Sequence, residues 1–453
     1  MHLSRKLVAL LASLAALIAV IGVSGASAGN GGTGVTGTPT VTPQVISDAA
    51  LHASTKTIGG AKVLPSTKTV AHWHGSSLDP NNGVTYGYNM VGADPNNCSG
   101  SACSTTVTVD VTPLIVNIDG LTFDGTSVWP ATLASPQFAL NDYGSTPAAT
   151  AAGSFPNAPA LTEGPGGTLS QGDAGNSLQL EDATMRAQFN QTGSSPYHVN
   201  LNPVLHPAVT INVPQGRGTL LESGRGVIFA DINISWWGSE IQNLDQTLKY
   251  NDPTHLPLYL TNNILLYIGN DVTNCCVIGF HGSGEVVGHG AGSGNGSGNQ
   301  AVQTFAWASW IQPGIYSRPN GGTDWAVQDI HALSHEISEW ADDPFVTNKV
   351  EPWLTPTAPQ YGCTGVLETG DPVVGIGFAM GSNSFEQGPN PNGTQSADGY
   401  YHPEDEVFLP WFMRTAPNDV SEPTQSASTN VGRYTFMGDL NPFSGFRGPA
   451  TGC

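Results

Sequence analysis

Residues 323–344 read T-D-W-A-V-Q-D-I-H-A-L-S-H-E-I-S-E-W-A-D-D-P, and their spacing predicts an α-helix. Apolar side chains recur at intervals of three and four residues, which forms one stripe of a helix: Ala326, Ile330, Leu333, Ile337 and Trp340. Thr323 or Asp324 can cap the start of this helix, and Pro344 stops it just after Asp343. The polar side chains between the apolar positions carry the chemistry of this stretch.

Three polar residues of the predicted helix share one face. At about 100° per residue, His331, His335 and Glu339 lie opposite the apolar stripe. The segment His335-Glu336-x-x-Glu339 is similar to the H-E-x-x-H pattern with which metallopeptidase helices bind zinc. Its second ligand position holds a carboxylate, which binds zinc or a harder cation. Glu336 then occupies the position of the general base, which takes a proton from metal-bound water.

A third metal ligand must come from outside the helix. Asp371, in the segment V-L-E-T-G-D-P of residues 366–372, is the first candidate, and Glu368 or His331 is the next. The alternative is an ordinary amphipathic helix whose acids face solvent. Six ionisable groups lie between residues 331 and 343, whereas charged residues make up only 11% of the chain. This concentration favours a metal site over a solvated face.

The N-terminus has the pattern of a secretory signal peptide. Two basic residues precede an apolar run from residue 7 to about residue 23, and the small residues at 26–28 offer a cleavage site. The alternative, an uncleaved anchor helix, requires a longer apolar run. We therefore expect residues 1–28 to be removed and residues 29–69 to form a flexible N-terminal segment. The mature protein is expected to be secreted, extracellular and free of the membrane.

The composition excludes one class of partner. The chain carries 14 basic and 35 acidic residues, and its formal net charge is −21. A surface of this sign repels phosphate backbones and anionic lipids, so a nucleic-acid partner is excluded. The 56 glycines and 33 prolines indicate a loop-rich extracellular fold.

Hydrophobic patterns predict both strands and helices ahead of the metal-binding helix. Alternating or continuously apolar runs predict strands over residues 105–119, 208–213, 256–268, 276–280 and 304–311. Helical spacing predicts a short helix over residues 182–191 and a longer one from Ile234 to Lys249. No internal repeat or linker interrupts these segments, so we expect one large α+β domain over residues 70–453.

The six cysteines indicate disulfides, because their number is even and the chain is expected to be exported. Cys98 and Cys103 lie in one short loop and are the safest pair. The adjacent Cys275 and Cys276 are expected to bond to different partners, which the two remaining cysteines, at positions 363 and 453, can supply. The sequence has no C-x-x-C spacing that supports metal binding by thiolates.

Two further motifs contain histidines. His72 and His74 of A-H-W-H-G would point to one side of a strand, and the motif is similar to the first copper-ligand motif of multicopper oxidases. The H-C-H run of that family is absent, so a strand with surface histidines is favoured. Residues 401–406, Y-H-P-E-D-E, group acids around a histidine. They can bind calcium, but we expect them to face solvent.

The segments S-H-E-I-S-E-W-A-D-D-P and E-T-G-D-P resemble a recurring arrangement in uncharacterised exported bacterial proteins, S-H-E-x-x-E-x-x-x-D-P followed by a tryptophan and E-x-G-D. The plant EXORDIUM (phosphate-induced) proteins are more distantly similar. They carry a C-G-F-H-like segment ahead of an H-E-x-x-E helix, and this chain has C-V-I-G-F-H at residues 276–281. The resemblance covers roughly residues 260–375. It implies a shared site with His335, Glu339 and Asp371 as ligands.

These features together predict a zincin-like α+β fold, in which a mixed sheet carries a central metal-binding helix within a loop-rich, disulfide-bonded chain. The expected function is a secreted hydrolase that uses zinc or another divalent cation and acts on a peptide or cell-wall-associated substrate. Glu336 is the expected catalytic base, and His335, Glu339 and Asp371 are the expected metal ligands. The missing second imidazole of H-E-x-x-H counts against peptidase activity.

The alternative is a non-catalytic secreted or cell-surface binding protein. In that case the same residues hold a structural metal, or no metal at all. The two functions differ in geometry, because a catalytic metal keeps an open coordination position in a cleft, whereas a structural metal is closed and buried.

Overall fold

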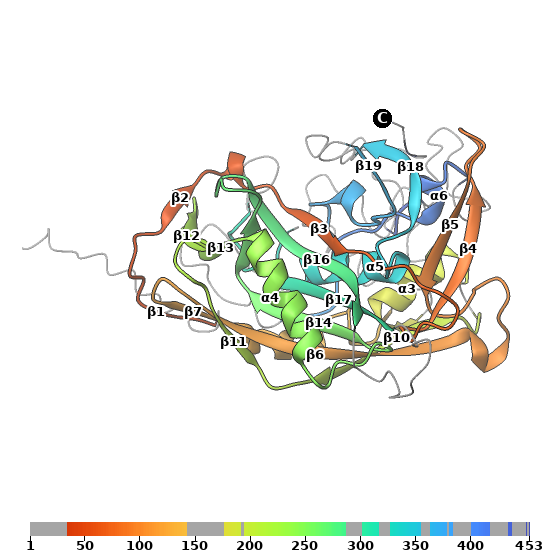
Figure 1. The fold of residues 1–453 in the computed structure, drawn as a ribbon, viewed down its shortest axis with the longest axis horizontal. Coiled ribbons are helices and arrows are strands. Elements are labelled where there is room, and N and C mark those ends of the chain that lie inside the picture. Colours follow the sequence, from red (N-terminus) through yellow and green to blue (C-terminus); the bar gives the residue numbers. More distant parts are fainter. Residues whose placement is uncertain are drawn as a thin grey trace, which may run out of the picture.

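The computed structural model describes residues 34–142, 176–191, 194–286, 301–316, 327–354, 363–377, 380–383, 400–416, 434–436, 450 and 453. The expected signal peptide lies outside these ranges. The described chain is a mixed α+β structure around one 13-stranded sheet, which confirms the fold class in its coarse form (Figure 1). None of the helices in these ranges is long and apolar enough to cross a membrane.

The large sheet contains strands from most of the described chain. They are β1 (Val35–Gly37), β2 (Gln44–Ile46), β3 (Ser54–Gly59), β6 (Ser104–Ile118), β7 (Leu121–Asp124), β10 (His198–Leu205), β11 (Val209–Asn212), β12 (Gly218–Ser223), β13 (Ile228–Asn233), β14 (Leu256–Asn262), β15 (Ile264–Tyr267), β16 (Cys275–Val286) and β17 (Ala301–Trp310). Their order is β1-β7-β6-β14-β17-β16-β15-β13-β12-β2, with β10 and β11 paired to β6, and β3 paired to β16. β14 is parallel to β6 and β17, whereas β16 is antiparallel to β17, so the sheet is mixed.

Short sheets and helices pack around this large sheet. The remaining strands form the pairs β4 (His72–Leu78) with β5 (Thr85–Val91), β8 (Asn141–Asp142) with β9 (Asn176–Leu178), and β18 (Lys349–Leu354) with β19 (Cys363–Val366). The α-helices are α1 (Trp129–Ala134), α3 (Leu180–Gln188), α4 (Ile234–Thr247), α5 (His331–Asp342) and α6 (Leu409–Phe412).

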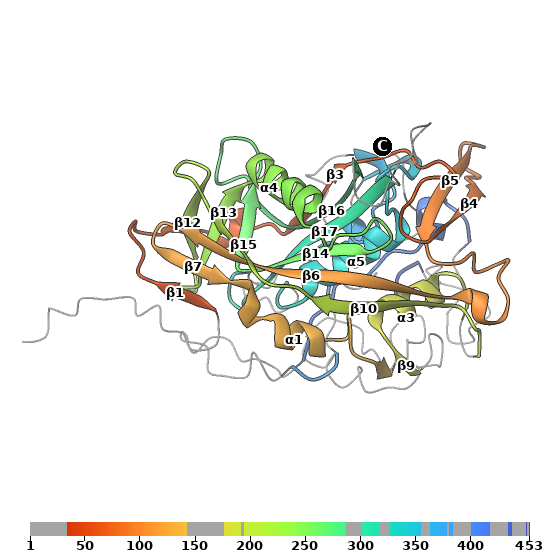
Figure 2. The ribbon, with the colours of Figure 1, turned by 60° about the horizontal axis from the view of Figure 1, so that its bottom comes forward.

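Alternate residues of β17 face the two sides of the sheet. Val302, Ala306 and Ala308 belong to a core that also contains residues of α1, α3 and α5, whereas Phe305 and Trp307 belong to a second core with α4. Because successive side chains of a strand point to opposite faces, α4 and α5 cover opposite sides of the sheet. Figure 2 shows α4 on one side of β6 and α1 on the other.

Most of the elements predicted around the site are confirmed. The strands β6, β11, β14, β15, β16 and β17 and the helices α3 and α4 overlap their predicted ranges. Helix α5 begins at His331 and not near Asp324. The chain just before it is not helical, because Asp329 has a φ of 44° and forms a bridge with Ile311.

Strands β1, β2 and β3, within residues 35–59, belong to the large sheet, whereas residues 29–69 were expected to form a flexible segment. β1 pairs with β7, β2 with β12, and β3 with β16. The three strands have the short sequences V-T-G, Q-V-I and S-T-K-T-I-G, which give too few positions for a periodic signal. Their ordered conformation therefore depends on pairing with strands that are distant in sequence.

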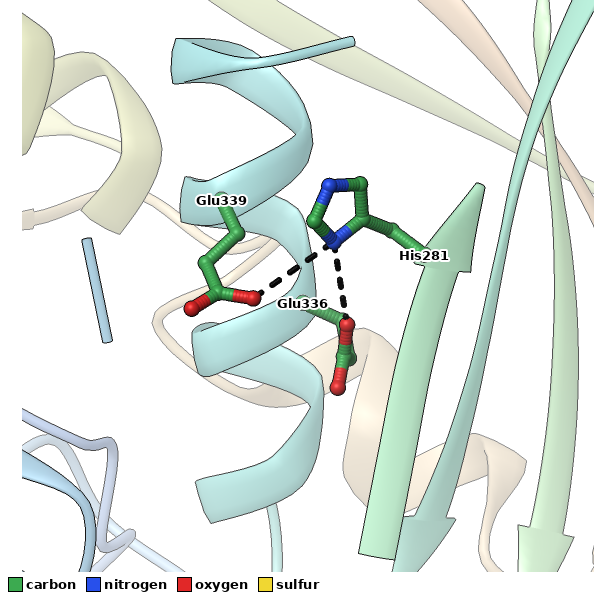
Figure 3. Close-up of side chains that lie close together, drawn as sticks. All are labelled: His281, Glu336 and Glu339. Carbon is green, nitrogen blue, oxygen red and sulfur yellow. Dashed lines mark ion pairs between the residues drawn. The ribbon is translucent and has the colours of Figure 1, made fainter. Parts of the chain in front are cut away.

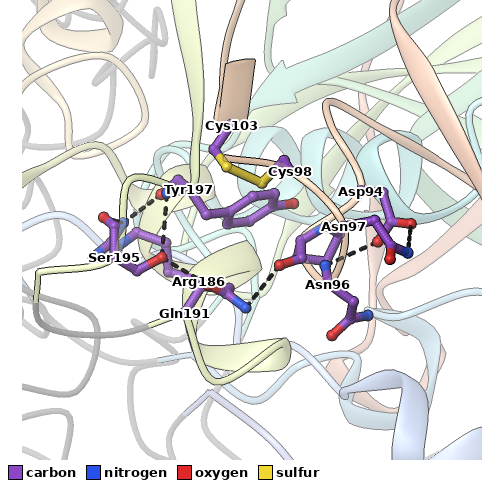
Figure 4. Close-up of a disulfide and its surroundings, with 10 residues drawn as sticks. Asp94, Asn96, Asn97, Cys98, Cys103, Arg186, Gln191, Ser195 and Tyr197 are labelled. Atoms are coloured by element: carbon purple, nitrogen blue, oxygen red, sulfur yellow. Dashed lines mark hydrogen bonds between the residues drawn. A yellow bond between two sulfur atoms is a disulfide. The ribbon is translucent and has the colours of Figure 1, made fainter. Parts of the chain in front are cut away.

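The predicted disulfide between Cys98 and Cys103 is confirmed (Figure 4). It closes the short loop ahead of β6. Gln191, just beyond the end of α3, donates a side-chain hydrogen bond to the backbone oxygen of Pro95 in the same loop (3.0 Å). The disulfide loop is thus tied to the helix that packs beside α5.

The pairing expected for the other cysteines is wrong. Cys275 bonds to its neighbour Cys276, and Cys363 bonds to Cys453 across 90 positions of sequence. The Cα atoms of Cys363 and Cys453 are 6.1 Å apart, within the range that a disulfide spans. Which cysteines meet depends on the path of the chain from β19 to its end, and the spacing of cysteines in sequence does not contain that path.

Candidate metal centre

Helix α5 is buried on all sides. Each of its twelve residues has a relative exposure of 2% or less, including both histidines and both glutamates. The predicted apolar stripe therefore does not leave a solvated face opposite it, because α3, β5, β16 and β17 pack around the helix. Buried carboxylates need a proton, a hydrogen-bond donor or a cation, so the polar side chains of α5 must be satisfied inside the protein.

The structure brings His335, Glu339 and Asp371 together. One ligand atom from each lies within 4.8 Å of the other two. The Oε1 atom of Glu339 is 3.0 Å from His335 Nε2, as the one-turn spacing on α5 allows. Asp371 comes from the 3-10 turn Asp371–Val373, and its backbone N–H donates to the same Oε1 (3.2 Å). The Thr55 hydroxyl of β3 donates to Asp371 Oδ1 (2.8 Å) and fixes the carboxylate.

A second group contains His281, Glu336 and Glu339, whose ligand atoms also lie within 4.8 Å of one another (Figure 3). His281 Nδ1 is 3.4 Å from Glu336 Oε2 and 3.5 Å from Glu339 Oε2. His281 is not among the ligands predicted from the sequence. Its signal was the C-V-I-G-F-H segment, which places a histidine on a strand ahead of the helix.

An irregularity in β16 turns His281 toward α5. The pairing of β16 with β3 shifts register between Val277 and Gly279. Ile278 lies in the core that includes α5, whereas Phe280 lies in the core on the α4 side. Such a shift in register changes which residues of a strand face each side, so His281 then points to Glu336 and Glu339.

Two glycines give the site side chains room. A Cβ atom on Gly279 would lie 2.5 Å from Glu336 Oε1. A Cβ atom on Gly370 would lie 2.3 Å from His335 Nδ1. Real Cβ contacts are never this short, so any larger residue at either position has to displace a candidate ligand or its backbone.

Glu404 contacts the imidazole rings of two histidines of α5. Its Oε2 atom is 3.0 Å from His335 Nδ1 and 2.7 Å from His331 Nε2. The backbone N–H of Glu404 donates to Ser334 Oγ (2.9 Å), which fixes the segment against the helix. The expectation that residues 401–406 face solvent is therefore wrong, because the whole segment is buried. The acids of this segment meet the histidines of α5 only in the tertiary structure.

The other residues considered as third ligand lie outside the two groups. His331 contacts Glu404 and does not join either three-residue group among the described residues. Glu368 is buried, and burial together with Glu339 raises its pKa well above the ordinary value. A protonated Glu368 can donate a hydrogen bond to Glu339 and so support the site without binding a metal.

Burial and ion pairing shift the pKa values of the carboxyl groups in opposite directions. Burial raises the pKa of Glu336 to about 8 and that of Asp371 to about 6. Burial also favours a higher pKa for Glu339, but His335 and His281 outweigh it and lower the pKa of Glu339 below its ordinary range. Glu339 is therefore the fixed negative charge at the centre of the site.

The pKa of His281, which contacts both glutamates, is raised. Burial acts to lower the pKa of His281, but the hydrogen-bonding and charge of Glu336 and Glu339 raise it to about 9. Neither ring nitrogen of His281 and neither carboxylate oxygen of Glu336 has a well-formed hydrogen bond in the described structure. Buried nitrogen and oxygen atoms that lack such bonds and face one another can act as ligands of a cation.

The copper-like motif does not contribute to this centre. His72 and His74 lie on β4, and His72 Nδ1 is 3.0 Å from the backbone oxygen of Val70. Within the described residues, neither histidine belongs to a group of potential metal ligands. A strand with partly exposed histidines agrees with the favoured interpretation of this motif.

Comparisons of the chain with known protein families, with curated proteins and with solved structures found no match. The resemblance to EXORDIUM-type proteins stays a prediction.

Proposed function

We propose that this chain is an exported metal-dependent hydrolase of zincin-like architecture that acts on peptide bonds. A zinc ion or another divalent cation is bound by His335, Glu339 and Asp371. The observation that supports this most directly is the meeting of Asp371 with the two α5 side chains, because Asp371 lies 32 positions beyond Glu339 in the sequence. One imidazole and two carboxylates form a donor set that zinc and harder cations accept.

Each residue of the site has a separate role in the proposed hydrolysis. A bound divalent cation lowers the pKa of coordinated water and polarises a carbonyl group. Glu336 adjoins the ligand His335 on α5 and accepts the proton of the attacking water, since its carboxylate oxygens have no well-formed hydrogen bond that competes. Glu404 holds the His335 ring through Nδ1 and so directs Nε2 toward Glu339 and the cation.

The fold and the compartment fit this function. A helix that carries ligands and packs on a mixed sheet is the arrangement expected of a zincin-like protein. Disulfides persist in oxidising compartments, and three pairs of cysteines bond in this chain. Together with the basic and apolar N-terminal pattern, they support secretion and an extracellular peptide or cell-wall-associated substrate.

Burial of the site favours a second candidate function, a non-catalytic binding protein with a structural metal. His335, Glu336 and Glu339 have relative exposures of 1% or less, and only Asp371 is partly exposed. Structural metal sites are closed, whereas catalytic sites keep one position open to substrate. Hydrolysis therefore requires that substrate approaches on the side of Asp371.

Metal content and activity of two variants separate these functions. The wild-type protein should bind zinc, His335→Ala should lose it, and Glu336→Gln should keep the His335-bound ion while losing hydrolysis of a peptide library. Glu240→Gln on α4 is the matched control and should change neither. Metal binding without hydrolysis in the wild type would favour the structural role. A wild type that binds no metal would contradict both metal-dependent functions.

A further inference from the structure

We propose that the chain binds a second divalent cation between β16 and α5, held by His281, Glu336 and Glu339, with Glu339 bridging the two cations. This inference rests on the proposed function, because it extends the same site. It makes the centre a two-metal site in which the first cation belongs to His335, Glu339 and Asp371.

The two oxygens of Glu339 face different donor sets. Oε1 lies 3.0 Å from His335 Nε2 and accepts from the backbone of Asp371. Oε2 lies on the other side, 3.5 Å from His281 Nδ1. The candidate ligands accordingly form two groups with Glu339 as their shared member. A bridging carboxylate has this arrangement in two-metal hydrolase sites, which hold their cations about 3.5–4 Å apart.

The second set of candidate ligands contains buried nitrogen and oxygen atoms that make no well-formed hydrogen bond. His281 and Glu336 are fully buried, and the ring nitrogens of His281 and both oxygens of Glu336 lack well-formed hydrogen bonds. Figure 3 shows the His281 ring directed at both carboxylates from the neighbouring strand. A buried side chain with unused donors and acceptors is costly unless a ligand binds it.

The local backbone supports this position for the second cation. Glu336 packs against Gly279, where a Cβ atom would come within 2.6 Å of its Cγ atom. The glycine thus allows the Glu336 carboxylate to lie against β16, two residues from His281. Binding through Oε2 leaves Oε1 of Glu336 to accept a proton, so the carboxylate keeps its role as base.

Once their protons are displaced, the carboxylates at the site carry more negative charge than one divalent cation neutralises. Three carboxylates belong to the two groups of ligands, Glu336, Glu339 and Asp371, and a fourth, Glu404, contacts His331 and His335 beside them. Three histidines contact them: His281, His331 and His335. When all four carboxylates are ionised, a single divalent cation neutralises only half of their charge in a buried environment, where each uncompensated charge is expensive. One imidazole and two carboxylates suit zinc or manganese at the second position.

Zinc stoichiometry tests this inference. The full-length mature protein is stripped with a chelator and reloaded with zinc chloride, and bound zinc per chain is measured by elemental analysis after gel filtration. We expect about two zinc ions in the wild type, about one in His281→Ala and about one in His335→Ala. His74→Ala, which removes an exposed histidine on β4, is the matched control and should keep two.

Two outcomes separate failure of this inference from failure of the proposed function. One zinc in the wild type, lost in His335→Ala but kept in His281→Ala, would overturn the second site and leave the proposed function intact. No zinc in the wild type would overturn both. Since His281→Ala can impair folding, Glu336→Gln provides a second test, because it keeps the side-chain shape and should still reduce binding from two ions to one.

Manganese offers an independent spectroscopic test. Two Mn²⁺ ions bridged by Glu339 should give an exchange-coupled electron paramagnetic resonance spectrum in the wild type. Glu336→Gln should give the spectrum of an isolated ion. An isolated-ion spectrum from the fully loaded wild type would exclude the bridge.

Discussion

Glu339 lies between two histidines from different elements, with Oε1 3.0 Å from Nε2 of His335 on α5 and Oε2 3.5 Å from Nδ1 of His281 on β16. One carboxylate therefore connects the helix to the strand. The pKa of Glu339 is lowered below its ordinary range by these histidines despite burial, so it stays charged while its neighbours take up protons.

Glu339→Gln should abolish high-affinity zinc binding at both groups, because the amide keeps the shape but removes the shared charge. The loss should be larger than that of His281→Ala or His335→Ala, each of which removes a ligand from one group only. Zinc titration against a chromophoric chelator measures the difference. Glu240→Gln, a carboxylate on α4 outside the site, is the matched control. Equal zinc binding in Glu339→Gln and wild type would exclude Glu339 as a ligand.

Gly370→Ala should weaken zinc binding by about tenfold or more, the range seen when the support of a ligand is disturbed. The backbone itself accepts alanine, since φ at this position is −82°. The added Cβ would lie 2.3 Å from His335 Nδ1 and has to displace the ring. Chelator competition measures the affinity.

The control for that change is Gly284→Ala on β16, where a Cβ atom meets nothing within 4 Å. It should leave zinc affinity unchanged. An unchanged affinity in Gly370→Ala as well would show that the turn before Asp371 shifts without moving His335.

Glu404→Gln should lower zinc affinity roughly 10- to 100-fold while the fold persists, because Glu404 orients His335 through Nδ1. The matched control is Glu406→Gln. Burial raises the pKa of Glu406 well above its ordinary value, whereas the pKa of Glu404 is lowered, so the amide at position 406 changes the charge less than the amide at position 404. Comparable losses in both variants would argue for a general packing effect in place of a positioning role.

Asp231→Asn should stabilise the protein at neutral pH by on the order of 1 kcal/mol or more. Asp231 on β13 is fully buried, neither of its carboxylate oxygens has a hydrogen bond, and burial raises its pKa well above the ordinary value. A group whose pKa is raised in the folded state contributes stability that is fully present at pH values below its unfolded-state pKa, about 3.9. This stability is lost as the pH rises through the folded-state pKa.

The gain from Asp231→Asn should accordingly grow with pH and vanish near pH 3, which thermal unfolding at several pH values measures. Asp271→Asn is the contrasting control, since hydrogen bonds from Thr273 lower the pKa of the exposed Asp271. It should give no gain at neutral pH. A pH-independent effect of Asp231→Asn would mean that the pKa of this carboxyl is the same in the folded and unfolded states.

The residues of α5 illustrate what local sequence contains. Intervals of three and four predicted the helix, and one helical turn places His335 and Glu339 on the same face, where their side chains reach the observed contact of 3.0 Å. The strands β6, β14 and β17 were predictable for the same reason, because alternation and β-branched composition act over a few residues.

By itself, therefore, the sequence determined the helix, most of the strands near it, the spacing of the candidate ligands on α5 and the position of one disulfide. The tertiary structure alone decided that α5 is buried, that β1 to β3 join the large sheet, that Cys363 meets Cys453, and that His281 and Glu404 reach the same helix. These facts depend on which strands pair and on a local shift of register in β16. Short-range periodicity fixes the conformation of a segment, whereas its neighbours follow from burial and pairing between residues far apart in the chain.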